Sequence, residues 1–200
     1  MKKILLIFIF IVSLTSNLFA DNDTKVKRIF EGKENAKIII ITYESLTCGH
    51  CADFHKNIYE KLKEEYIDKG LVKFEHHAFP LDLAALNAEI VVRCQNSIEK
   101  KFDLLTDIYN KQTTWAVGSD INKINQLIKK VGINFGLTNE KMDKCLKNEQ
   151  AQDEILEQRI EAQKKYKIES TPTIYINEKK YEGEHQYKSF KKNLQKLLKE

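Results

Sequence analysis

Residues 37–51 read KIIIITYESLTCGHC, a run of isoleucines that leads through a short polar turn to two cysteines three positions apart. Residues 37–43 are typical of a strand that is covered on both faces of a sheet. Residues 48–68 have helical spacing and stop before Gly70, and residues 72–79 alternate as a second strand. The predicted helix buries one stripe of side chains: Cys51, Phe54, Ile58 and Leu62. We therefore expect a strand–helix–strand unit with both thiols at the carboxyl end of a strand, where α/β sheets carry their sites.

The tetrad Cys48-Gly49-His50-Cys51 lies at the predicted start of this helix. Free N–H groups and the positive end of the helix dipole stabilise a thiolate on Cys48, and His50 adds a donor or a positive charge. A structural disulfide gains nothing from such a setting, whereas a disulfide that opens and closes depends on it. The tetrad therefore predicts a redox-active Cys48–Cys51 pair.

The first twenty residues have the pattern of a secretory signal peptide. Lys2 and Lys3 precede an apolar run at residues 4–14, and small or polar residues lead to Ala20. The apolar run is shorter than a membrane span requires, although an uncleaved anchor is the alternative. We expect residues 1–20 to be removed and the mature chain to reach the periplasm, where its cysteines can be oxidised.

Charge is spread along the chain and does not gather in blocks. The 33 Lys and Arg residues lie among 29 Asp and Glu residues, and the formal net charge is +4. A nucleic-acid-binding protein carries a basic stripe or patch, and this sequence has none. No repeat or low-complexity linker interrupts the pattern. The mature part therefore predicts one globular, mostly helical unit that does not bind nucleic acid.

Residues 80–150 show helical spacing and no strand signal. The helical stretches are residues 84–109, 120–131 and 139–148, with glycines at the breaks. A further helix follows at residues 152–166. A strand at Thr173–Ile176, a short strand at residues 180–182 and an amphipathic helix close the chain, in that order. This order predicts an all-helical insertion within an α/β unit.

Two further cysteines, Cys94 and Cys145, both lie within the helical insertion. Because the chain is expected to be exported and their number is even, they most simply pair with each other. A loop of this length would add about 4 kcal/mol to the free energy of unfolding in the chain-entropy model. Two buried free thiols are the alternative.

The stretches Ser45-Leu46-Thr47-Cys48-Gly49-His50-Cys51 and Ser170-Thr171-Pro172-Thr173, with the element order, resemble the thioredoxin superfamily. The resemblance is to its DsbA-like thiol:disulfide oxidoreductases, in particular those of alphaproteobacteria, in which a disulfide like Cys94–Cys145 also occurs. It implies an α/β thioredoxin fold with an inserted all-helical subdomain. The thioredoxin-like domain would comprise residues 21–79 and 151–200, and the inserted subdomain residues 80–150.

The resemblance also implies a role for each site residue. Cys48 would be the nucleophile that forms a mixed disulfide with a client protein, and Cys51 the resolving thiol. His50 would stabilise the Cys48 thiolate. Pro172 would be a cis proline that faces the tetrad, and the backbone of Thr171 would pair with the client.

Two positions depart from the family pattern. Thr42 occupies the place, six residues before the nucleophile, where many thioredoxin-fold enzymes have a buried acid, and Glu44 is two positions away. Thr171 stands where enterobacterial-type oxidases usually have valine, and threonine also occurs there in disulfide isomerases. About sixteen residues between Ala20 and the first strand are too few for an isomerase's N-terminal dimerisation domain, which argues against an isomerase. We expect a monomer.

The expected activity is donation of the Cys48–Cys51 disulfide to folding exported proteins that carry free cysteines. Reoxidation by a DsbB-like membrane quinone reductase is implied by the resemblance, and no cofactor or metal is expected. An isomerase or reductase of the same fold is the alternative. A copper-binding or client-binding protein of thioredoxin fold is a further one, although copper-delivery proteins usually space the two cysteines by three residues.

The remaining candidate residues favour structural roles. His76 and His77 alternate along a strand, so one is expected in the core and the other at the surface. His55 shares the helix of Cys51 and either tunes the pair or has a packing or solvated role. Trp115 is expected in the core. Two acidic side chains are expected to be solvated: Glu75 and Asp82.

Overall fold

The computed structural model describes residues 29–200, so the predicted signal peptide at residues 1–20 lies outside the described residues. The strands are β1 (Ile29–Glu31), β2 (Ile38–Glu44), β3 (Val72–Ala78), β4 (Thr173–Ile176) and β5 (Lys179–Lys180). They form one sheet in the order β1-β3-β2-β4-β5. β2 is parallel to β3 and antiparallel to β4, which places the end of β2 in the middle of the sheet. The predicted strands β2, β3 and β4 are confirmed.

β1 is a strand that the sequence analysis missed. It pairs antiparallel with β3, with Ile29 opposite His76. Its three residues are too few to show the two-residue period that identifies a strand. Pairing with the open edge of β3 therefore makes this segment a strand, and Ile29 is fully buried.

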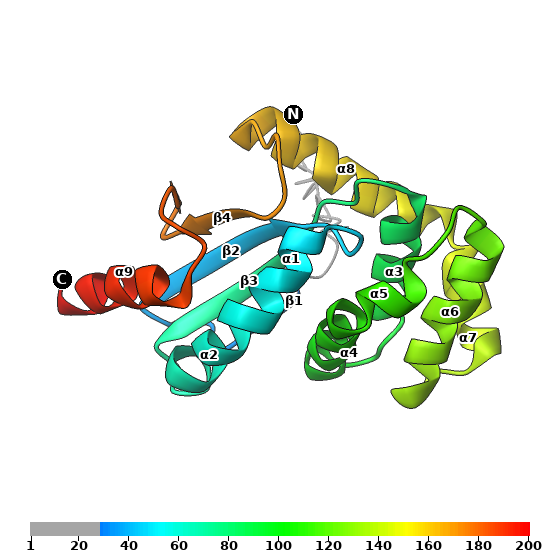
Figure 1. Ribbon diagram of the computed structural model, residues 1–200, viewed down its shortest axis with the longest axis horizontal. Coiled ribbons are helices and arrows are strands. Elements are labelled where there is room, and N and C mark those ends of the chain that lie inside the picture. The colour runs from blue at the N-terminus through cyan, green and yellow to red at the C-terminus, as the bar shows by residue number, and fades with distance from the viewer. Residues whose placement is uncertain (1–28) are drawn as a thin grey trace, which may run out of the picture.

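Some helices pack against the sheet, and a group of helices lies beside it (Figure 1). The helix after β2 has four consecutive parts, two of them π-helical: α1 (Gly49–Phe54), η1 (His55–Tyr59), α2 (Glu60–Leu62) and η2 (Lys63–Ile67). The helices between β3 and β4 are α3 (Leu83–Arg93), α4 (Ile98–Asn110), α5 (Gln112–Trp115), α6 (Ile121–Asn134), α7 (Asn139–Leu146) and α8 (Glu149–Tyr166). The chain ends with α9 (Tyr187–Lys199).

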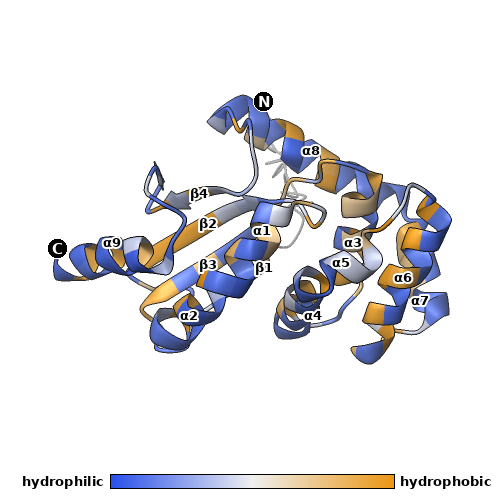
Figure 2. Ribbon diagram, in the orientation of Figure 1, coloured by the Kyte–Doolittle hydropathy of each residue, from blue (hydrophilic) through white to orange (hydrophobic). Residues whose placement is uncertain are grey.

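Hydrophobic side chains from α1 and α9 meet on one face of the sheet. The ring of Phe54 lies 6.2 Å from that of Phe74 on β3 and 5.8 Å from that of Phe190 on α9. All three side chains are almost completely buried. Figure 2 shows the corresponding hydrophobic stretches on β2 and β3, while the helices carry them only as stripes. Burial of this face fixes α1, and with it Cys48, against the end of β2.

α8 covers the opposite face of the sheet at its β2–β4 end. Tyr43 of β2 contacts Tyr166 at the end of α8, with ring centroids 5.6 Å apart, and Tyr175 of β4, at 6.1 Å. Ala162 of α8 belongs to the same cluster. With helices on both faces, β2 is a central covered strand, which explains its unbroken apolar run.

Helices α3–α7 lie together on one side of the sheet and share its main hydrophobic core. Phe102 of α4 stacks on Tyr59 of η1, with ring centroids 5.8 Å apart. The helical stretch predicted at residues 84–109 is two helices, because α3 ends before Cys94 and Ser97 begins α4 by accepting a hydrogen bond from the Lys100 N–H. The α/β class with inserted helices agrees with the prediction.

The structure joins Cys94 and Cys145 in a disulfide with Cα atoms 6.1 Å apart. Cys94 follows α3 directly and Cys145 belongs to α7, so the bond ties these two helices together. Trp115 is fully buried, as expected, and its Nε1 donates to the carbonyl oxygen of Ile108.

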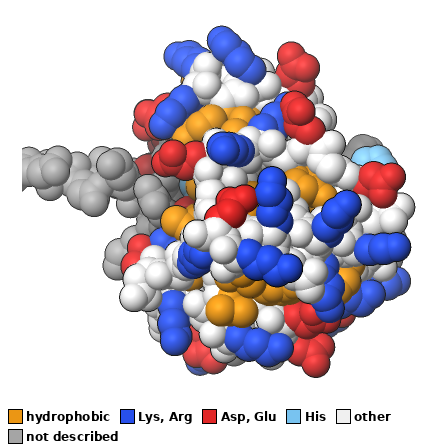
Figure 3. Space-filling view, turned by 90° about the vertical axis from the view of Figure 1, so that its left-hand side faces the viewer, with side chains coloured by type: hydrophobic (Ala, Val, Ile, Leu, Met, Phe, Trp, Pro, Cys, Tyr) orange, Lys and Arg blue, Asp and Glu red, His pale blue; other side chains and the backbone are white. Residues whose placement is uncertain are grey.

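Charged side chains of both signs lie on the face of the molecule that carries α9. Figure 3 shows the face that carries α9, where Lys and Arg side chains lie among Asp and Glu side chains. Within residues 29–200, no helix combines the length and the apolar character that a membrane crossing needs.

Candidate redox site

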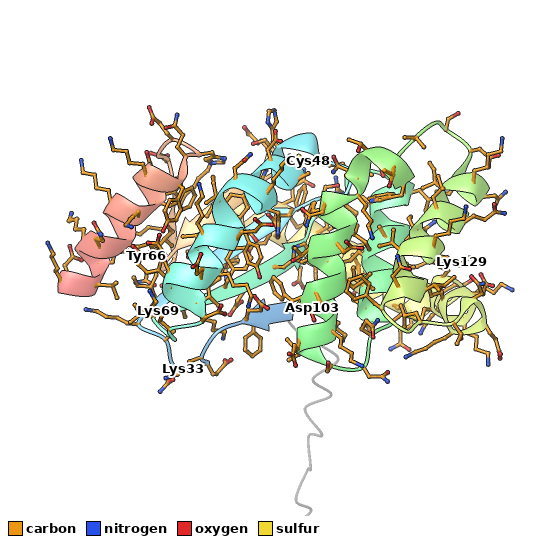
Figure 4. All side chains as sticks on the ribbon, turned by 60° about the horizontal axis from the view of Figure 1, so that its bottom comes forward. Lys33, Cys48, Tyr66, Lys69, Asp103 and Lys129 are labelled. Carbon is orange, nitrogen blue, oxygen red and sulfur yellow. A yellow bond between two sulfur atoms is a disulfide. The ribbon has the colours of Figure 1, made fainter. Side chains whose placement is uncertain are left out.

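Cys48 occupies the N-cap position of α1, at the tip of the cyan helix in Figure 4. Its backbone is extended, with φ −78° and ψ 118°, and no side chain caps the helix. The N–H groups of the first turn therefore remain available to the sulfur. Cys48 is partly exposed, and its Sγ lies 3.2 Å from the carbonyl oxygen of Thr171. Thr171, predicted to bind the client, therefore lies beside Cys48. The Thr171–Pro172 peptide bond is cis, as predicted.

The surroundings of Cys48 lower the pKa of its thiol to about 5. The hydrogen bond from the Cys51 thiol contributes most, and burial opposes it. Thr171 and the backbone N–H groups of Cys51 and His50 act in the same direction as Cys51. The hydroxyl of Thr171 is buried without a hydrogen-bond partner, so it is free to donate to the thiolate. Cys48 is therefore a thiolate at neutral pH.

Cys51 has the opposite environment. It is completely buried, and burial raises the pKa of its thiol far above the usual range. The hydrogen bond to Cys48 and the negative charge of Glu44 raise the pKa further. Both cysteines are free thiols in this structure. The pair is therefore strongly asymmetric, with an exposed acidic thiol and a buried weakly acidic one.

His50 points away from the core and is exposed. It lines a cavity of about 390 Å³ together with Thr171, Pro172 and His185. Burial and the nearby His50 lower the pKa of His185. This cavity adjoins the cis proline.

Glu44 is a buried acid beneath the cysteine pair. Its Oε2 accepts hydrogen bonds from His55 Nε2 at 3.1 Å and His76 Nδ1 at 2.9 Å, and all three side chains have no exposed surface. Glu44 Oε1 is buried with no hydrogen-bond partner. Burial favours the neutral acid, but the two histidines outweigh it and lower the pKa of Glu44 to about 2. Thr42 holds no charge and donates to the carbonyl oxygen of Glu75.

His76 continues the chain of charges toward α3. Its Nε2 lies 3.0 Å from Glu89 Oε2, and Arg93 Nε lies 2.7 Å from Glu89 Oε1. Burial disfavours charge on His76, but Glu89 and Glu44 raise its pKa to about 9. The two neighbouring histidines face opposite ways, as the alternation predicts: His76 is buried and His77 is partly exposed. No local sequence pattern marks this cluster, because its members come from four separate elements.

Glu75 corrects one expectation from the sequence. It is almost fully buried and pairs with His77 at 3.0 Å and Lys73 at 3.0 Å, so it is not a solvated charge. Asp82 is exposed, as expected, but it also accepts from the Thr47 hydroxyl at 2.8 Å and begins α3.

A family model described as thioredoxin matches residues 24–196. The chain belongs to the thioredoxin family. Known relatives include a protein of Rickettsia bellii assigned as a protein-disulfide oxidoreductase, which is 32% identical over 147 residues. The match covers 73% of this chain and 55% of that protein, so the chain spans about half the length of this relative. Disulfide bond formation protein D of Bacillus subtilis is 28% identical, over 84% of this chain and 76% of that protein.

Solved structures show the same likeness. The crystal structure of Wolbachia pipientis alpha-DsbA1 has a TM-score of 0.79 and 28% identity, and the match covers 86% of this chain and 90% of that one. A structure titled protein-disulfide isomerase from Novosphingobium aromaticivorans has a TM-score of 0.77 at 21% identity, which supports the fold alone. The predicted thioredoxin fold and the DsbA-like resemblance are therefore confirmed.

Gln112 is a residue of this thioredoxin-family site that the sequence analysis missed. Its Nε2 donates to the carbonyl oxygens of Leu46 at 2.8 Å and Cys48 at 3.0 Å. It comes from α5, within the inserted helices, 64 residues after Cys48. No local pattern marks such a residue, since only the tertiary structure brings it to the tetrad.

The described part of the chain, residues 29–200, contains no group of three or more His, Cys, Asp or Glu side chains arranged to hold a metal ion.

Proposed function

We propose that this thioredoxin-family protein is a thiol:disulfide oxidoreductase that acts as an oxidase and donates the Cys48–Cys51 disulfide to client proteins. The observation that carries the proposal is the low pKa of Cys48, about 5. Stabilising the Cys48 thiolate stabilises the reduced protein relative to the disulfide. The disulfide then becomes a stronger oxidant, because its reduction leads to a form of the protein that is lower in free energy.

The cycle transfers two electrons from a client dithiol to the pair. A client thiolate attacks Cys48 Sγ, the Cys48–Cys51 bond breaks, and Cys51 leaves and takes up a proton. A second client thiolate then attacks the client sulfur of the mixed disulfide and releases Cys48 as a thiolate. The partial exposure of Cys48 and the burial of Cys51 support this division of roles.

The client would lie against Thr171 and Pro172. His50, Thr171 and Pro172 line a cavity of about 390 Å³, and Thr171 also contacts Cys48, so a client side chain could occupy this cavity. The Thr171 backbone would pair with the client chain.

The proposed setting is the periplasm, based on the signal-peptide pattern of residues 1–20. Clients would be folding exported proteins with free cysteines, and a DsbB-like membrane quinone reductase would reoxidise the pair. We propose that the mature protein works as a monomer with a thioredoxin-like domain at residues 21–79 and 151–200 and a helical insertion at residues 80–150.

Isomerase activity is the second candidate, and Thr171 before the cis proline is the observation that favours it. An isomerase must hold the mixed disulfide long enough for the client to rearrange, whereas an oxidase releases it. The two activities are separated by comparing a reduced peptide substrate with a scrambled disulfide substrate.

The test is the reduction potential of the Cys48–Cys51 pair, measured by equilibration with glutathione buffers and mass-resolved alkylation. The alkylation assigns thiols separately to Cys48–Cys51 and to Cys94–Cys145. A potential of roughly −120 mV would support the oxidase. A potential of roughly −270 mV would indicate a reductase and contradict the proposed oxidase function.

Oxidation of a reduced two-cysteine peptide provides the activity test. Cys48→Ser should abolish oxidation. Cys51→Ala, given the oxidised form of the peptide, should form a mixed disulfide between Cys48 and the peptide, because the Cys48 thiolate attacks the peptide disulfide and no second protein thiol resolves the product. Cys94→Ala/Cys145→Ala is the matched control, because it removes two cysteines distant from the tetrad and should still oxidise the peptide. Oxidation by Cys48→Ser at the unaltered rate would refute the mechanism.

A further inference from the structure

The cavity beside the cis proline is lined by three segments of the chain. The helix after β2 contributes one face, with residues three or four positions apart: His50, Asp53, Phe54, Asn57 and Ile58. The cis-proline loop contributes residues 170–172, and His185 comes from the segment before α9. Small-molecule pockets measure about 300–1,000 Å³, so a cavity of about 390 Å³ can take one long side chain of a client.

The lining combines apolar and polar groups. Phe54 and Ile58 are almost completely buried in the core, so only the edges of their side chains face the cavity. Asp53 and Asn57 are exposed and line the same cavity. Such a lining suits a side chain with an alkyl stem and a polar head group, because the stem can lie on apolar edges while the head group stays hydrated or hydrogen-bonded.

Asp53 supplies the negative charge of this cavity. It is the one carboxylate among the described residues that line it, and it makes no hydrogen bond or salt bridge with another described residue. Two more exposed carboxylates, Glu169 and Glu184, each adjoin a lining residue in the chain. Lys56 is the exposed charge of opposite sign next to the lining. The charge around the cavity is therefore mainly negative.

The two histidines of the lining leave this balance negative. Burial and the nearby His50 lower the pKa of His185, so the His185 ring is neutral at neutral pH. A positive charge on His50 would still leave three carboxylates against two cations around the cavity. The cavity therefore attracts a positively charged side chain and repels a negatively charged one.

Thr171 adds a hydrogen-bonding group on the cis-proline side. The residue is only 9% exposed, and its buried hydroxyl has no hydrogen-bond partner. A hydroxyl that donates to the Cys48 thiolate still has lone pairs that accept from an N–H group. The cavity thus offers acceptors on both its helix side and its cis-proline side.

We propose that this cavity selects clients that carry a basic side chain, arginine or lysine, next to the reacting cysteine, and that Asp53 binds the cation. This inference rests on the proposed redox function of the Cys48–Cys51 pair. It adds a charge preference to that function. Asp53 acts on the client side chain and takes no part in the exchange of the disulfide.

Arginine fits the lining better than lysine. Its alkyl stem would lie along the apolar edges of Phe54 and Ile58. Its guanidinium group has five N–H donors in a fixed plane, and Asp53, Asn57 and Thr171 offer acceptors to them. The ammonium group of lysine has three donors and meets fewer of these acceptors at once.

The test compares three reduced peptides as reductants of the oxidised protein. Each peptide has two cysteines, and the residues that flank them are all arginine, all glutamine or all glutamate. The rate constant for loss of the Cys48–Cys51 disulfide is measured at low salt and near neutral pH, by acid quenching and mass-resolved alkylation. Charge beside a cysteine also changes the reactivity of the peptide itself. The arginine-to-glutamine ratio of rate constants is therefore compared between proteins, which cancels that contribution.

Asp53→Asn is the test variant, because it removes the charge and keeps the shape of the side chain. We expect the arginine-to-glutamine ratio of the unaltered protein to be at least about twofold higher than that of Asp53→Asn, as for a partly exposed ion pair. High salt should reduce this difference, because it screens exposed charges. Asp153→Asn on α8 is the matched control, since it removes an exposed carboxylate outside the cavity and should keep the unaltered ratio.

Asp53→Lys reverses the charge and provides a second variant. Each of its rate constants is divided by that of Asp53→Asn with the same peptide, and the glutamate peptide should then exceed the arginine peptide. Asp53 is exposed and makes no bond to another described residue, so both variants should fold. A ratio in Asp53→Asn that differs from the unaltered ratio by less than twofold would overturn the proposal, as would an arginine preference that persists in Asp53→Lys.

The outcomes separate this inference from the proposed function. Exchange with the same arginine-to-glutamine ratio in the unaltered protein and Asp53→Asn would remove the charge preference and leave the oxidase standing. A potential typical of a reductase would exclude the oxidase. The same peptides would then be given as disulfides to the reduced protein, where the same preference is expected. Loss of exchange with every peptide would refute the redox function and this inference with it.

Discussion

Gln112 and Cys48 lie 64 residues apart in the chain, yet Gln112 Nε2 donates a 3.0 Å hydrogen bond to the carbonyl oxygen of Cys48. The same amide group donates to the carbonyl oxygen of Leu46 at 2.8 Å. A helix from the insertion thus holds the turn that presents Cys48. The insertion is therefore part of the redox site as well as a cover for the core.

Gln112→Ala should lower the free energy of unfolding by about 1–2 kcal/mol, because two hydrogen bonds to partly buried carbonyl groups are lost. It should also slow peptide oxidation, because the Leu46–Cys48 turn is less firmly held. Urea unfolding and the peptide assay measure the two effects. Gln150→Ala removes an exposed bond between Gln150 and Glu154 on α8 and is the control. Equal effects of the two substitutions would contradict the role of Gln112.

Alkylation of Cys48 by iodoacetamide should follow a titration with a midpoint near pH 5, the value to which the thiol's pKa is lowered. A depressed pKa stabilises the folded reduced protein above the pKa of the unfolded thiol, and this stability is lost as the pH falls through about 5. The reduced protein should therefore gain stability relative to the oxidised protein between about pH 5 and 8.5. A midpoint above pH 8 would show that the site does not activate Cys48.

The buried cluster of Glu44, His76 and Glu89 should limit stability at both ends of the pH range. The pKa of each carboxyl is lowered to about 2, so their contribution is present above about pH 4.5 and is lost toward pH 2. The pKa of His76 is raised from 6.5 to about 9, so its contribution is present below pH 6.5 and is lost as the pH rises through 9. Urea unfolding between pH 3 and 10 measures both limits.

In the same series, His76→Gln should lower stability near neutral pH, because it leaves buried carboxylates without a cation. It should also remove the decline between about pH 6.5 and 9. His77→Gln should retain that decline. A decline that persists unchanged in His76→Gln would assign it to another group.

Cys94→Ala/Cys145→Ala should lower the free energy of unfolding by up to about 4 kcal/mol, because the bond closes a long loop between α3 and α7. Both proteins are compared with the Cys48–Cys51 pair oxidised, and unfolding is followed by the fluorescence of the single tryptophan, Trp115. The reduction potential of the tetrad should change little, since neither cysteine contacts it. Unchanged unfolding would show that the crosslink adds no stability.

Most of the fold was predictable, because its signals are local. The isoleucine run of β2, the alternation of β3 and the strand after Pro172 can each be recognised from a few neighbouring residues. The sequence analysis missed β1 and the break between α3 and α4. The first depends on pairing with β3. The second follows from Ser97, a serine N-cap that was an available local signal.

The sequence by itself determined which residues are proposed to carry the redox chemistry, since a thiol pair at a helix start is recognised within four residues. Only the tertiary structure decided what surrounds them. Glu44, His76 and Glu89 come from β2, β3 and α3, and they meet because parallel pairing places the ends of β2 and β3 side by side and α3 packs against them. Contacts between distant segments depend on how the elements pack, and no local pattern records that packing.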